Sequence, residues 1–442
     1  MVDRQTGTRQ NTNIIRVVAA SMAGTTVEWY DFFLYGVAAA LVFNSVFFPA
    51  LGPAAGTVAS LATFAIGFVA RPVGGLVFGH YGDRLGRKKL LVISLVMMGA
   101  ATFAIGLLPS AATIGVAAPI LLIVLRLIQG FALGGEWGGA VLIVSEHGDP
   151  ARRGYWASWP QAGVPLGQLL ANGLLFLLAA VQDDASFQSW GWRIPFLLSA
   201  VLVLIGLYIR LSVEESPVFR AAQERAAEQP AAEHMPIVDV FRRYPREVFT
   251  AMGARFAENV SYYIFTIVIT SYLTARFGLP SSFVLGAVLI GAAFHLVTVP
   301  IWGALSDRFG RRPVYLLGAA GVGVWGFVFI ALIDTTNFGL TVLAVVGGLF
   351  FHGAMYGPQA AFLSELFGTN VRYSGVSVGY QLASVVAGGL APIIAVALYT
   401  AFDSGYAVAV YVALSALLTL VAVATYGETR HRDLADDPAL TR

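Results

Sequence analysis

The sequence contains twelve apolar stretches of roughly 20 residues or more, the length that a helix needs to cross the hydrocarbon core of a bilayer. Their centres lie near Asp31, Phe68, Met98, Gly130, Gln168, Leu202, Ser261, Leu289, Gly323, Phe351, Ala387 and Leu417. The stretches that begin near Val17, Ile114 and Phe338 exceed this minimum, which indicates tilted helices. In a chain that is 57% hydrophobic and 12% charged, the pattern predicts an all-α membrane protein with twelve transmembrane helices.

Two connections between these stretches carry the same charged motif. The residues from Gly79 to Lys89 contain an Asp-Arg-x-Gly-Arg core, which returns 224 positions later between Gly303 and Pro313. A Ser-Glu pair followed by an arginine repeats at an offset of 219, and Glu28 repeats as Glu258 at an offset of 230. An internal repeat at half the chain length predicts two similar halves.

Basic residues concentrate in every second connection. They occur before the first apolar stretch, in the 84–89 hairpin, at Arg152 and Arg153, at 210–246, at 308–312, at Arg372, and at Arg430 and Arg432. The opposite connections hold only Arg193 and Arg276. By the positive-inside rule, we expect both hairpins, the middle connection and both termini to be cytoplasmic.

The predicted halves comprise residues 1–215 and 247–426, joined by a linker at 216–246 and followed by a tail at 427–442. Within the linker, Ile237, Val240, Phe241 and Tyr244 follow helical spacing beside arginines. This pattern predicts a short amphipathic helix. Two roles remain open for it: a helix on the inner membrane surface, or a solvated linker helix.

Several classes of protein are excluded or disfavoured. The chain has no cysteine, which excludes disulfides and thiol chemistry. Its only lysines, Lys88 and Lys89, do not belong to a phosphate-binding loop, and the six histidines form no His-Glu-x-x-His motif. The first apolar stretch, from about Val17 to Phe48, is too long for a signal peptide. We therefore expect neither an enzyme nor an ATP-driven pump, and no metal, cofactor or nucleic acid.

Several longer motifs occur in one order along the chain. They are Val27-Glu28-Trp29-Tyr30-Asp31-Phe32, Ala70-Arg71-Pro72, Arg126-Leu127-Ile128-Gln129-Gly130, Gly134-Gly135-Glu136-Trp137-Gly138-Gly139, Trp190-Gly191-Trp192-Arg193-Ile194-Pro195-Phe196 and Glu214-Glu215-Ser216-Pro217-Val218-Phe219. In these motifs the chain resembles the major facilitator superfamily and, within it, metabolite:proton symporters such as shikimate, α-ketoglutarate and proline/betaine permeases. The resemblance implies two six-helix bundles around a cavity that opens alternately to each side, in a monomer of the inner membrane.

The resemblance also implies that the charged hairpins latch one conformation. The residues assigned to this latch are Gly79, Asp83, Arg84, Gly86, Arg87, Glu146, Arg153, Asp307, Arg308, Glu365 and Arg372. The aspartates can accept hydrogen bonds from the start of a facing helix or pair with arginines. Topology signalling alone explains the basic residues but not the repeated order of the motif.

Two acids of the first stretch are candidates for proton binding. Glu28 and Asp31 are three residues apart, on one helix face, and lie about 17 to 22 Å from the helix start. Burial and mutual repulsion favour protonation of at least one of them. Arg126 is a permanent cation that can pair with one of these carboxylates or with an anionic substrate. An alternative role for either acid is a static partner of an intramembrane arginine.

Further polar residues within the stretches are candidates for substrate binding. They are Tyr35, Arg126, Gln129, Trp137, Gln161, Arg255, Glu258, Tyr262, Tyr356, Gln359 and Tyr380. Hydrogen bonding between helices is the competing role for each of them. Arg255 and Glu258 can equally neutralise each other, and we interpret His295 and His352 first as packing or network residues.

Taken together, these features predict a proton-driven importer of a small organic acid. The alternative within transport is a symporter of a zwitterionic osmolyte such as betaine or proline. The repeated latch motifs disfavour a channel. The substrate cannot be named from the sequence, because the shape of its cavity depends on residues that several helices bring together.

Overall fold

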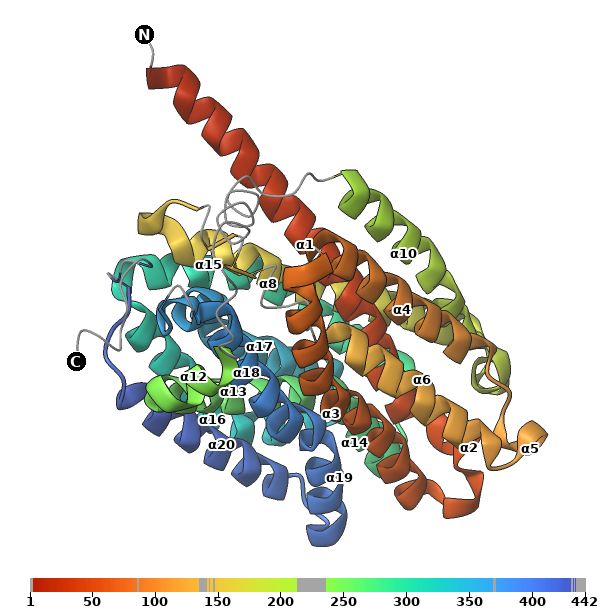
Figure 1. Cartoon of the computed structure of the whole chain (residues 1–442). Coiled ribbons are helices and arrows are strands. Elements are labelled where there is room, and N and C mark those ends of the chain that lie inside the picture. Colours follow the sequence, from red (N-terminus) through yellow and green to blue (C-terminus); the bar gives the residue numbers. More distant parts are fainter. Residues whose placement is uncertain are drawn as a thin grey trace.

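The computed structural model describes residues 3–85, 87–134, 141–142, 144–145, 148–212, 236–368, 371–430, 432 and 434, and Figure 1 shows their arrangement. The side chains of residues 3–13, 79–91, 210, 212, 236–239 and 373 lie outside this description. The described residues form helices and turns and contain no strand.

The long helices of the N-terminal half are α1 (Asp3–Leu41), α3 (Pro53–Leu85), α4 (Arg87–Leu107), α6 (Ala117–Leu133), α8 (Arg153–Val181) and α10 (Arg193–Ser212). Short helices complete the connections: α2 (Phe43–Phe47), η1 (Pro49–Leu51), α5 (Ala111–Ile114), η2 (Pro150–Arg152), α9 (Asp184–Ser186) and η3 (Phe187–Gly191). The first apolar stretch, which was expected to run to about Phe48, therefore ends as a continuous helix at Leu41.

The C-terminal half begins with α12 (Pro236–Arg243) and α13 (Pro245–Tyr263). It continues through η4 (Ile264–Val268), α14 (Ile269–Phe277), α15 (Ser281–Phe309), α16 (Arg311–Ile333), α17 (Phe338–Glu365), α18 (Arg372–Ala383), η5 (Ser384–Gly389), α19 (Ala391–Phe402) and α20 (Tyr406–Ala424). The segments η4 and η5 are π-helical and join the helices on either side of them into longer segments.

Each of the twelve predicted centres lies in a different helical segment of this order. Among the described residues, seven helices are long and apolar enough to cross a membrane, and an eighth qualifies if the bent pair at 184–209 is one span. Val92–Leu107 and Ala117–Leu133 are shorter apolar helices. The helices α1 and α13 carry ionisable residues at mid-length, which lowers their hydropathy.

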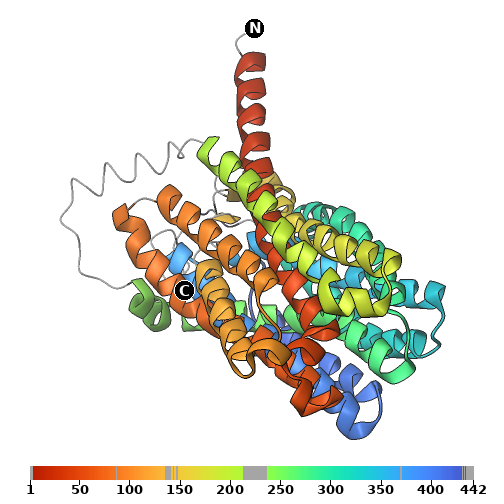
Figure 2. The same cartoon turned by 90° about the vertical axis from the view of Figure 1, so that its right-hand side faces the viewer.

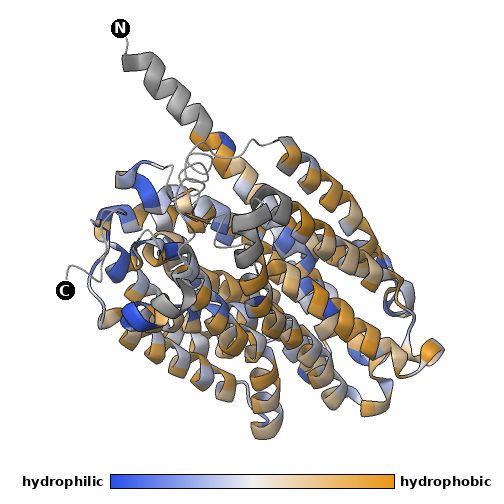
Figure 3. Ribbon diagram, viewed as in Figure 1, coloured by the Kyte–Doolittle hydropathy of each residue, from blue (hydrophilic) through white to orange (hydrophobic). Residues whose placement is uncertain are grey.

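Large apolar side chains cover the outward faces of the helices. Val324 on α16 and Leu414, Leu417 and Val421 on α20 are all more than half exposed. Figure 3 shows hydrophobic residues along the helices and hydrophilic ones gathered toward one end of the bundle. A soluble monomer rarely exposes apolar surface on this scale, whereas lipid would cover it.

Glycines allow the central helices to approach each other closely. A Cβ atom added to Gly163 or Gly167 of α8 would lie 2.8 Å from the Met22 carbonyl or 2.6 Å from the Thr26 carbonyl of α1. These contacts hold α1 against α8, and α8 in turn packs along α15 of the other half. Close backbone approach of this kind brings the α1 acids to the centre of the bundle.

The predicted linker helix is present as α12 (Figure 2). Val240 and Tyr244 are buried, and the Tyr244 ring lies 6.1 Å from that of Phe367, between ring centroids. Phe241 is 47% exposed. Val240 of the helix and Tyr244, which follows its last residue Arg243, are therefore packed against the C-terminal half. The linker residues before Pro236 lie outside the described part of the chain, so the domain boundaries stay a prediction.

Candidate functional site

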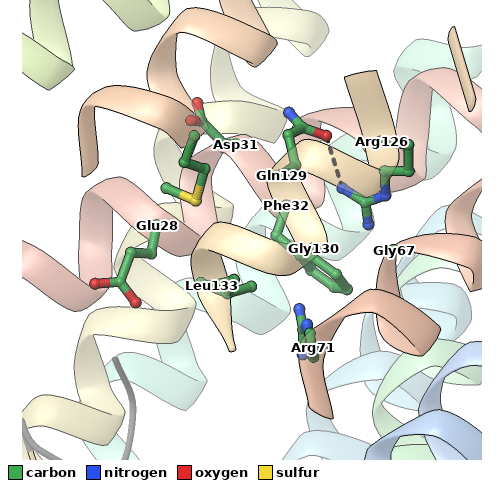
Figure 4. Close-up of a pocket in the computed structure, with 10 residues that line it drawn as sticks. Glu28, Asp31, Phe32, Gly67, Arg71, Arg126, Gln129, Gly130 and Leu133 are labelled. Atoms are coloured by element: carbon green, nitrogen blue, oxygen red, sulfur yellow. Dashed lines mark hydrogen bonds between the residues drawn. The ribbon is translucent and has the colours of Figure 1, made fainter. Parts of the chain in front are cut away.

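Charged residues of the N-terminal half line a small cavity between α1, α3, α4 and α6 (Figure 4). Glu28 and Asp31 come from α1, Arg71 from α3 and Arg126 from α6. All four are at most 4% exposed. The helical spacing therefore brings both α1 acids to one cavity, as expected, together with Arg126 and a second arginine.

A chain of hydrogen bonds links Asp31 to Arg126. The Thr102 hydroxyl donates to Asp31 Oδ2 (2.8 Å) and accepts from Gln129 Nε2 (2.7 Å). Gln129 Oε1 accepts from Arg126 Nη1 (3.0 Å). The proposed acid and its cation are thus connected through two neutral side chains rather than by a direct ion pair. Asp31 Oδ1 has no hydrogen-bond partner within the described residues.

Arg71 and Arg126 rest mainly on aromatic rings. The Arg126 Cζ atom lies 4.2 Å from the Tyr35 ring centroid, and the Arg71 Cζ atom lies 4.4 Å from that of Phe68. The centroid of the Phe32 ring lies 5.0 Å from the Arg126 Cζ atom and 4.6 Å from the Arg71 Cζ atom. The Nε and Nη2 atoms of both arginines make no hydrogen bond within the described part of the chain. Buried donors of this kind are costly unless a ligand satisfies them.

The buried charges of the C-terminal half are densely hydrogen-bonded. Arg255 Nη1 pairs with Glu258 Oε2 at 2.5 Å and donates to Gln359 Oε1 at 3.0 Å. Its Nη2 atom donates to the Asn259 amide oxygen and the Ser384 hydroxyl. The guanidinium also lies 3.6 Å from the Tyr380 ring centroid. The sequence left mutual neutralisation of Arg255 and Glu258 open, and the structure contains this pair.

Two histidines extend this cluster. His352 Nε2 lies 3.3 Å from Glu258 Oε1, and His352 Nδ1 lies 3.0 Å from His295 Nε2. Both imidazoles are fully buried, and Tyr262 and Tyr356 pack against them. The interpretation as polar-network residues is confirmed, and the network includes a carboxylate that the sequence did not connect to them.

A second small cavity lies between the two halves. Trp29 and Val164 of the N-terminal half line it together with Arg255, Glu258, Asn259, Tyr262, Tyr263, His352 and Tyr356. The Tyr262 hydroxyl crosses the interface and donates to Gln168 Oε1 at 2.8 Å. The ring of Tyr263 contacts those of Phe32, Phe64 and Phe68, so an aromatic layer divides this cavity from the first.

Four of the other predicted substrate residues belong to these two clusters. Tyr35 and Gln129 contact Arg126, whereas Gln359 and Tyr380 contact Arg255. Gln161 is buried in α8. Trp137 lies outside the described residues. The substrate role of each residue remains a prediction.

At one end of the bundle, predicted latch residues join the two halves. Asp307 accepts hydrogen bonds from the Gly154 and Tyr155 amides at the start of α8, both at 2.8 Å, and pairs with Arg311 at 2.6 Å. Glu365 pairs with Arg153 of the N-terminal half at 3.0 Å. Both contacts hold α8 against the C-terminal half, so this end is closed between α8 and that half.

The structure describes the remaining latch residues only in part. Arg372 donates to carbonyl groups at the end of α17, and the Arg308 carbonyl accepts from Arg430. Gly86 and Glu146 lie outside the described residues. The backbone of Gly79, Asp83, Arg84 and Arg87 is helical, but their side chains are outside the description. The latch function remains a prediction.

Sequence reasoning missed Arg71, Thr102, Asn259 and Ser384 as members of these clusters. An arginine within an apolar stretch was a signal for Arg71. His295 lies 224 residues after Arg71, the same offset that separates the two charged hairpins. The repeat therefore indicated that these two residues occupy related positions in the two halves. The other three are common neutral polar residues in membrane helices, and only their contacts distinguish them.

Comparison with known proteins agrees with this architecture. The family model described as "Sugar (and other) transporter" matches residues 16–235 and again 222–438, once in each half. The solved structure of the major facilitator superfamily proton:xylose symporter XylE, bound to 6-bromo-6-deoxy-D-glucose, superposes with a TM-score of 0.76. This likeness covers 98% of this chain and 99% of XylE at 19% identity, and so it shows the fold.

The chain belongs to the major facilitator superfamily, in its sugar (and other) transporter family. The predicted twelve-helix fold with two six-helix bundles is thereby confirmed. The transporter is 43% identical to the inner membrane metabolite transport protein YhjE of Escherichia coli K12, over 95% of both chains. It is 42% identical to the shikimate transporter of that organism, over 93% of this chain and 94% of the relative. The proline/betaine transporter of Escherichia coli K12 is 35% identical, over 95% of this chain and 84% of the relative.

Proposed function

We propose that this transporter is a proton-coupled symporter that imports a small organic acid, a mono- or dicarboxylate of the shikimate type, by alternating access. One observation carries the proposal: Arg71 and Arg126 are buried at one cavity, and each retains two guanidinium nitrogens without a hydrogen bond in the described chain. A carboxylate is the natural ligand for such planar donors.

The balance of buried charge supports coupling to protons. Three arginines and three carboxylates are among the described residues that line the two cavities. When all six are ionised, their charges cancel, and His352 is left out of this balance. Protonation of one carboxylate would leave an excess positive charge in a low-dielectric space. A bound monoanion would remove this excess. Proton and anion therefore favour each other's binding, and each raises the affinity of the other by the same factor.

Asp31 is the favoured proton carrier, with Glu28 as its alternative. The Thr102–Gln129 bridge transmits the charge state of Asp31 to Arg126 through hydrogen bonds. An anion that draws Arg126 away from Gln129 would loosen this bridge and favour the protonated acid. Together with the similarity to a shikimate transporter, this arrangement supports an organic acid as the cargo.

A zwitterion symporter is the second candidate. Similarity to the proline/betaine transporter supports it, as do the aromatic rings of Trp29 and Tyr263 at the second cavity. Such rings can bind a quaternary ammonium group by cation–π interaction. The two candidates differ in one property: a zwitterion adds no net charge to the site, whereas an organic anion does.

The experiment begins with a thermal-shift screen of purified protein against monocarboxylates, dicarboxylates and betaines. Ligands that stabilise the protein are then tested for uptake into proteoliposomes with and without an inward proton gradient. The proposal predicts stabilisation by a carboxylate and its accumulation only with the gradient. Stabilisation by betaines alone would favour the second candidate, and rapid uptake without saturation would indicate a channel.

We further propose an inner-membrane location with both termini cytoplasmic and a monomeric state. The distribution of basic residues supports the orientation, and the YhjE name supports the membrane. In this orientation the closed end, at which Asp307 and Glu365 contact α8, faces the cytoplasm. Its contacts would then act as the latch of the state that is closed to the inside.

A further inference from the structure

We propose a second proton-binding site in the C-terminal half: a relay of His295 and His352 that delivers a proton to Glu258 and thereby frees Arg255. This inference rests on the proposed function and adds a proton acceptor to it. It starts from three ionisable side chains, on α15, α17 and α13, that share consecutive contacts of 3.0 and 3.3 Å.

Donor and acceptor chemistry sets the direction of these contacts. Glu258 is paired with Arg255, which stays protonated, so the carboxylate is ionised and can only accept. His352 Nε2 therefore carries the proton that it donates to Glu258 Oε1. With both imidazoles neutral, His352 Nδ1 is an acceptor and His295 Nε2 donates to it.

The relay ends at an unsatisfied atom. In this arrangement His295 Nδ1 is an acceptor, and it has no hydrogen-bond partner within the described residues. Because His295 is fully buried, this lone pair is not satisfied by bulk solvent. A basic nitrogen of this kind is where the chain can take up a proton when the bundle opens.

Proton uptake can proceed without creating a lasting charge on either ring. A proton binds His295 Nδ1, the proton on His295 Nε2 passes to His352 Nδ1, and the proton on His352 Nε2 passes to Glu258 Oε1. Both imidazoles end neutral with exchanged tautomers, and Glu258 becomes a neutral acid. The net change is one proton gained, and it is located on Glu258.

Protonation of Glu258 changes the second cavity. Arg255 loses its ion pair but keeps hydrogen bonds to Gln359, Asn259 and Ser384 and its position on the Tyr380 ring. The guanidinium is therefore held in place with its charge uncompensated. A carboxylate that enters the cavity beside Arg255 replaces the one that has been neutralised.

The surroundings contain few competing charges. Among the described residues, Arg255 is the cation next to Glu258, and Arg71 of the N-terminal half lies near Arg255. Besides the two histidines, the ionisable groups around Glu258 among the described residues are phenols, from Tyr262, Tyr263, Tyr315, Tyr356 and Tyr380. The α8 residues that reach this cluster, Val164 and Gln168, are uncharged. Within the described residues, the two histidines therefore form the route by which a proton can reach Glu258 through groups that exchange protons near neutral pH.

The positions that the repeat relates to the two histidines cannot form such a relay in the described part of the N-terminal half. The 224-residue offset relates His295 to Arg71, and the 219-residue offset relates His352 to Leu133. A permanent cation and an apolar side chain cannot pass a proton. The acid repeats as Glu28 and Glu258, and Glu258 lies beside an imidazole.

The test uses purified full-length protein without substrate and follows infrared difference spectra after a rapid step to acidic pH. The band of protonated Glu258 is identified as the carboxyl band that Glu258→Gln lacks. We expect this band in the unmodified protein and at least about tenfold slower appearance in His295→Gln and His352→Gln, because an amide does not pass protons. Thr298→Val, which keeps both rings and removes a hydroxyl that, among the described residues, donates only to the His295 backbone carbonyl, should match the unmodified protein.

Two results would overturn the relay: no Glu258 carboxyl band at acidic pH, or equal rates in both histidine variants and the unmodified protein. His295→Gln leaves the contact between His352 and Glu258 intact, which guards against a folding defect in the other variant. The rate at which the unmodified protein gains the Glu258 carboxyl band in deuterated buffer is an independent measurement. Deuterium should slow the appearance of this band because three coupled proton transfers precede it. No substrate is used, so failure of the relay is distinguishable from failure of proton-driven uptake.

Discussion

The N-terminal and C-terminal halves both bury arginines and carboxylates within their helices but satisfy them differently. In the first half, Arg126 makes one hydrogen bond to the described residues and otherwise rests on aromatic rings. In the second half, Arg255 has an ion pair, three further hydrogen bonds and a ring contact. The difference teaches that a buried cation can be kept available for a ligand in one half and be structurally engaged in the other.

The acids differ in the same way. Asp31 has one carboxyl oxygen without a hydrogen bond in the described chain, whereas both oxygens of Glu258 are occupied. In the proposed mechanism, a proton would reach Asp31 at the oxygen that has no described partner, but it would reach Glu258 through His352, which already donates to it. The halves therefore combine a loosely held site with a tightly networked one.

The largest expected effect concerns Asp31. Asp31→Asn should abolish accumulation of substrate against its gradient while preserving counterflow exchange, because the site can still bind and reorient but no longer releases a proton. Uptake into proteoliposomes with an imposed pH gradient measures both activities. Ser261→Ala, at the related position of the other half, is the matched control and should accumulate normally. Should Asp31→Asn and Glu28→Gln both accumulate substrate, coupling must lie elsewhere, with Glu136 and Glu258 the next acids to test.

The second effect concerns stability. Arg255→Ala leaves the buried Glu258 without its cation and should reduce the free energy of unfolding by about 3–5 kcal/mol. Arg126→Ala breaks no ion pair within the described residues and should cost less. Thermal unfolding in detergent compares the two variants. The double variant Arg255→Ala/Glu258→Gln should recover part of the loss, and equal destabilisation by both arginine variants would contradict the contrast between halves.

A smaller effect is expected for substrate affinity. Arg126→Lys keeps the charge but replaces a planar fork by a point donor, and hydrogen bonds to charged groups contribute about 1.5–3 kcal/mol. We therefore expect a roughly 10- to 100-fold loss of affinity for a carboxylate in a binding assay. At a pH at which Glu258 is ionised, Arg255→Lys should lose less affinity, because Glu258 then neutralises the Arg255 charge. Near-normal binding by Arg126→Lys would return this arginine to a structural role.

The smallest effect concerns the closed end. Asp307→Asn removes the charge that binds the start of α8 and Arg311, and should shift the population toward opening of this end by up to about tenfold. Single cysteines introduced at each end report accessibility, with no native cysteine to interfere. Asp83→Asn in the first hairpin should shift the same balance and slow transport if both hairpins act as latches. An unchanged balance in both variants would leave the hairpins as topology signals only.

Much of the architecture is visible in the sequence because it depends on local properties. Apolar length predicts each span, the repeated hairpin predicts two halves, and a three-residue spacing places Glu28 and Asp31 on one face of α1. The predicted linker helix follows equally from its spacing, but the burial of Val240 and Tyr244 depends on contacts with the C-terminal half. Periodicity shows which residues share a face but not what that face meets.

The connections between charges were decided by the tertiary structure. Asp31 reaches Arg126 through Thr102 of α4, and His295 meets His352 across 57 positions of the chain. Neither link has a local signature, because threonine and histidine in an apolar stretch are compatible with packing anywhere on the helix. The sequence by itself determined which ionisable groups enter the membrane, since their cost there is a property of each helix. Which groups share a proton or leave a guanidinium free depends on the helix crossings, which set distances between side chains remote in the chain.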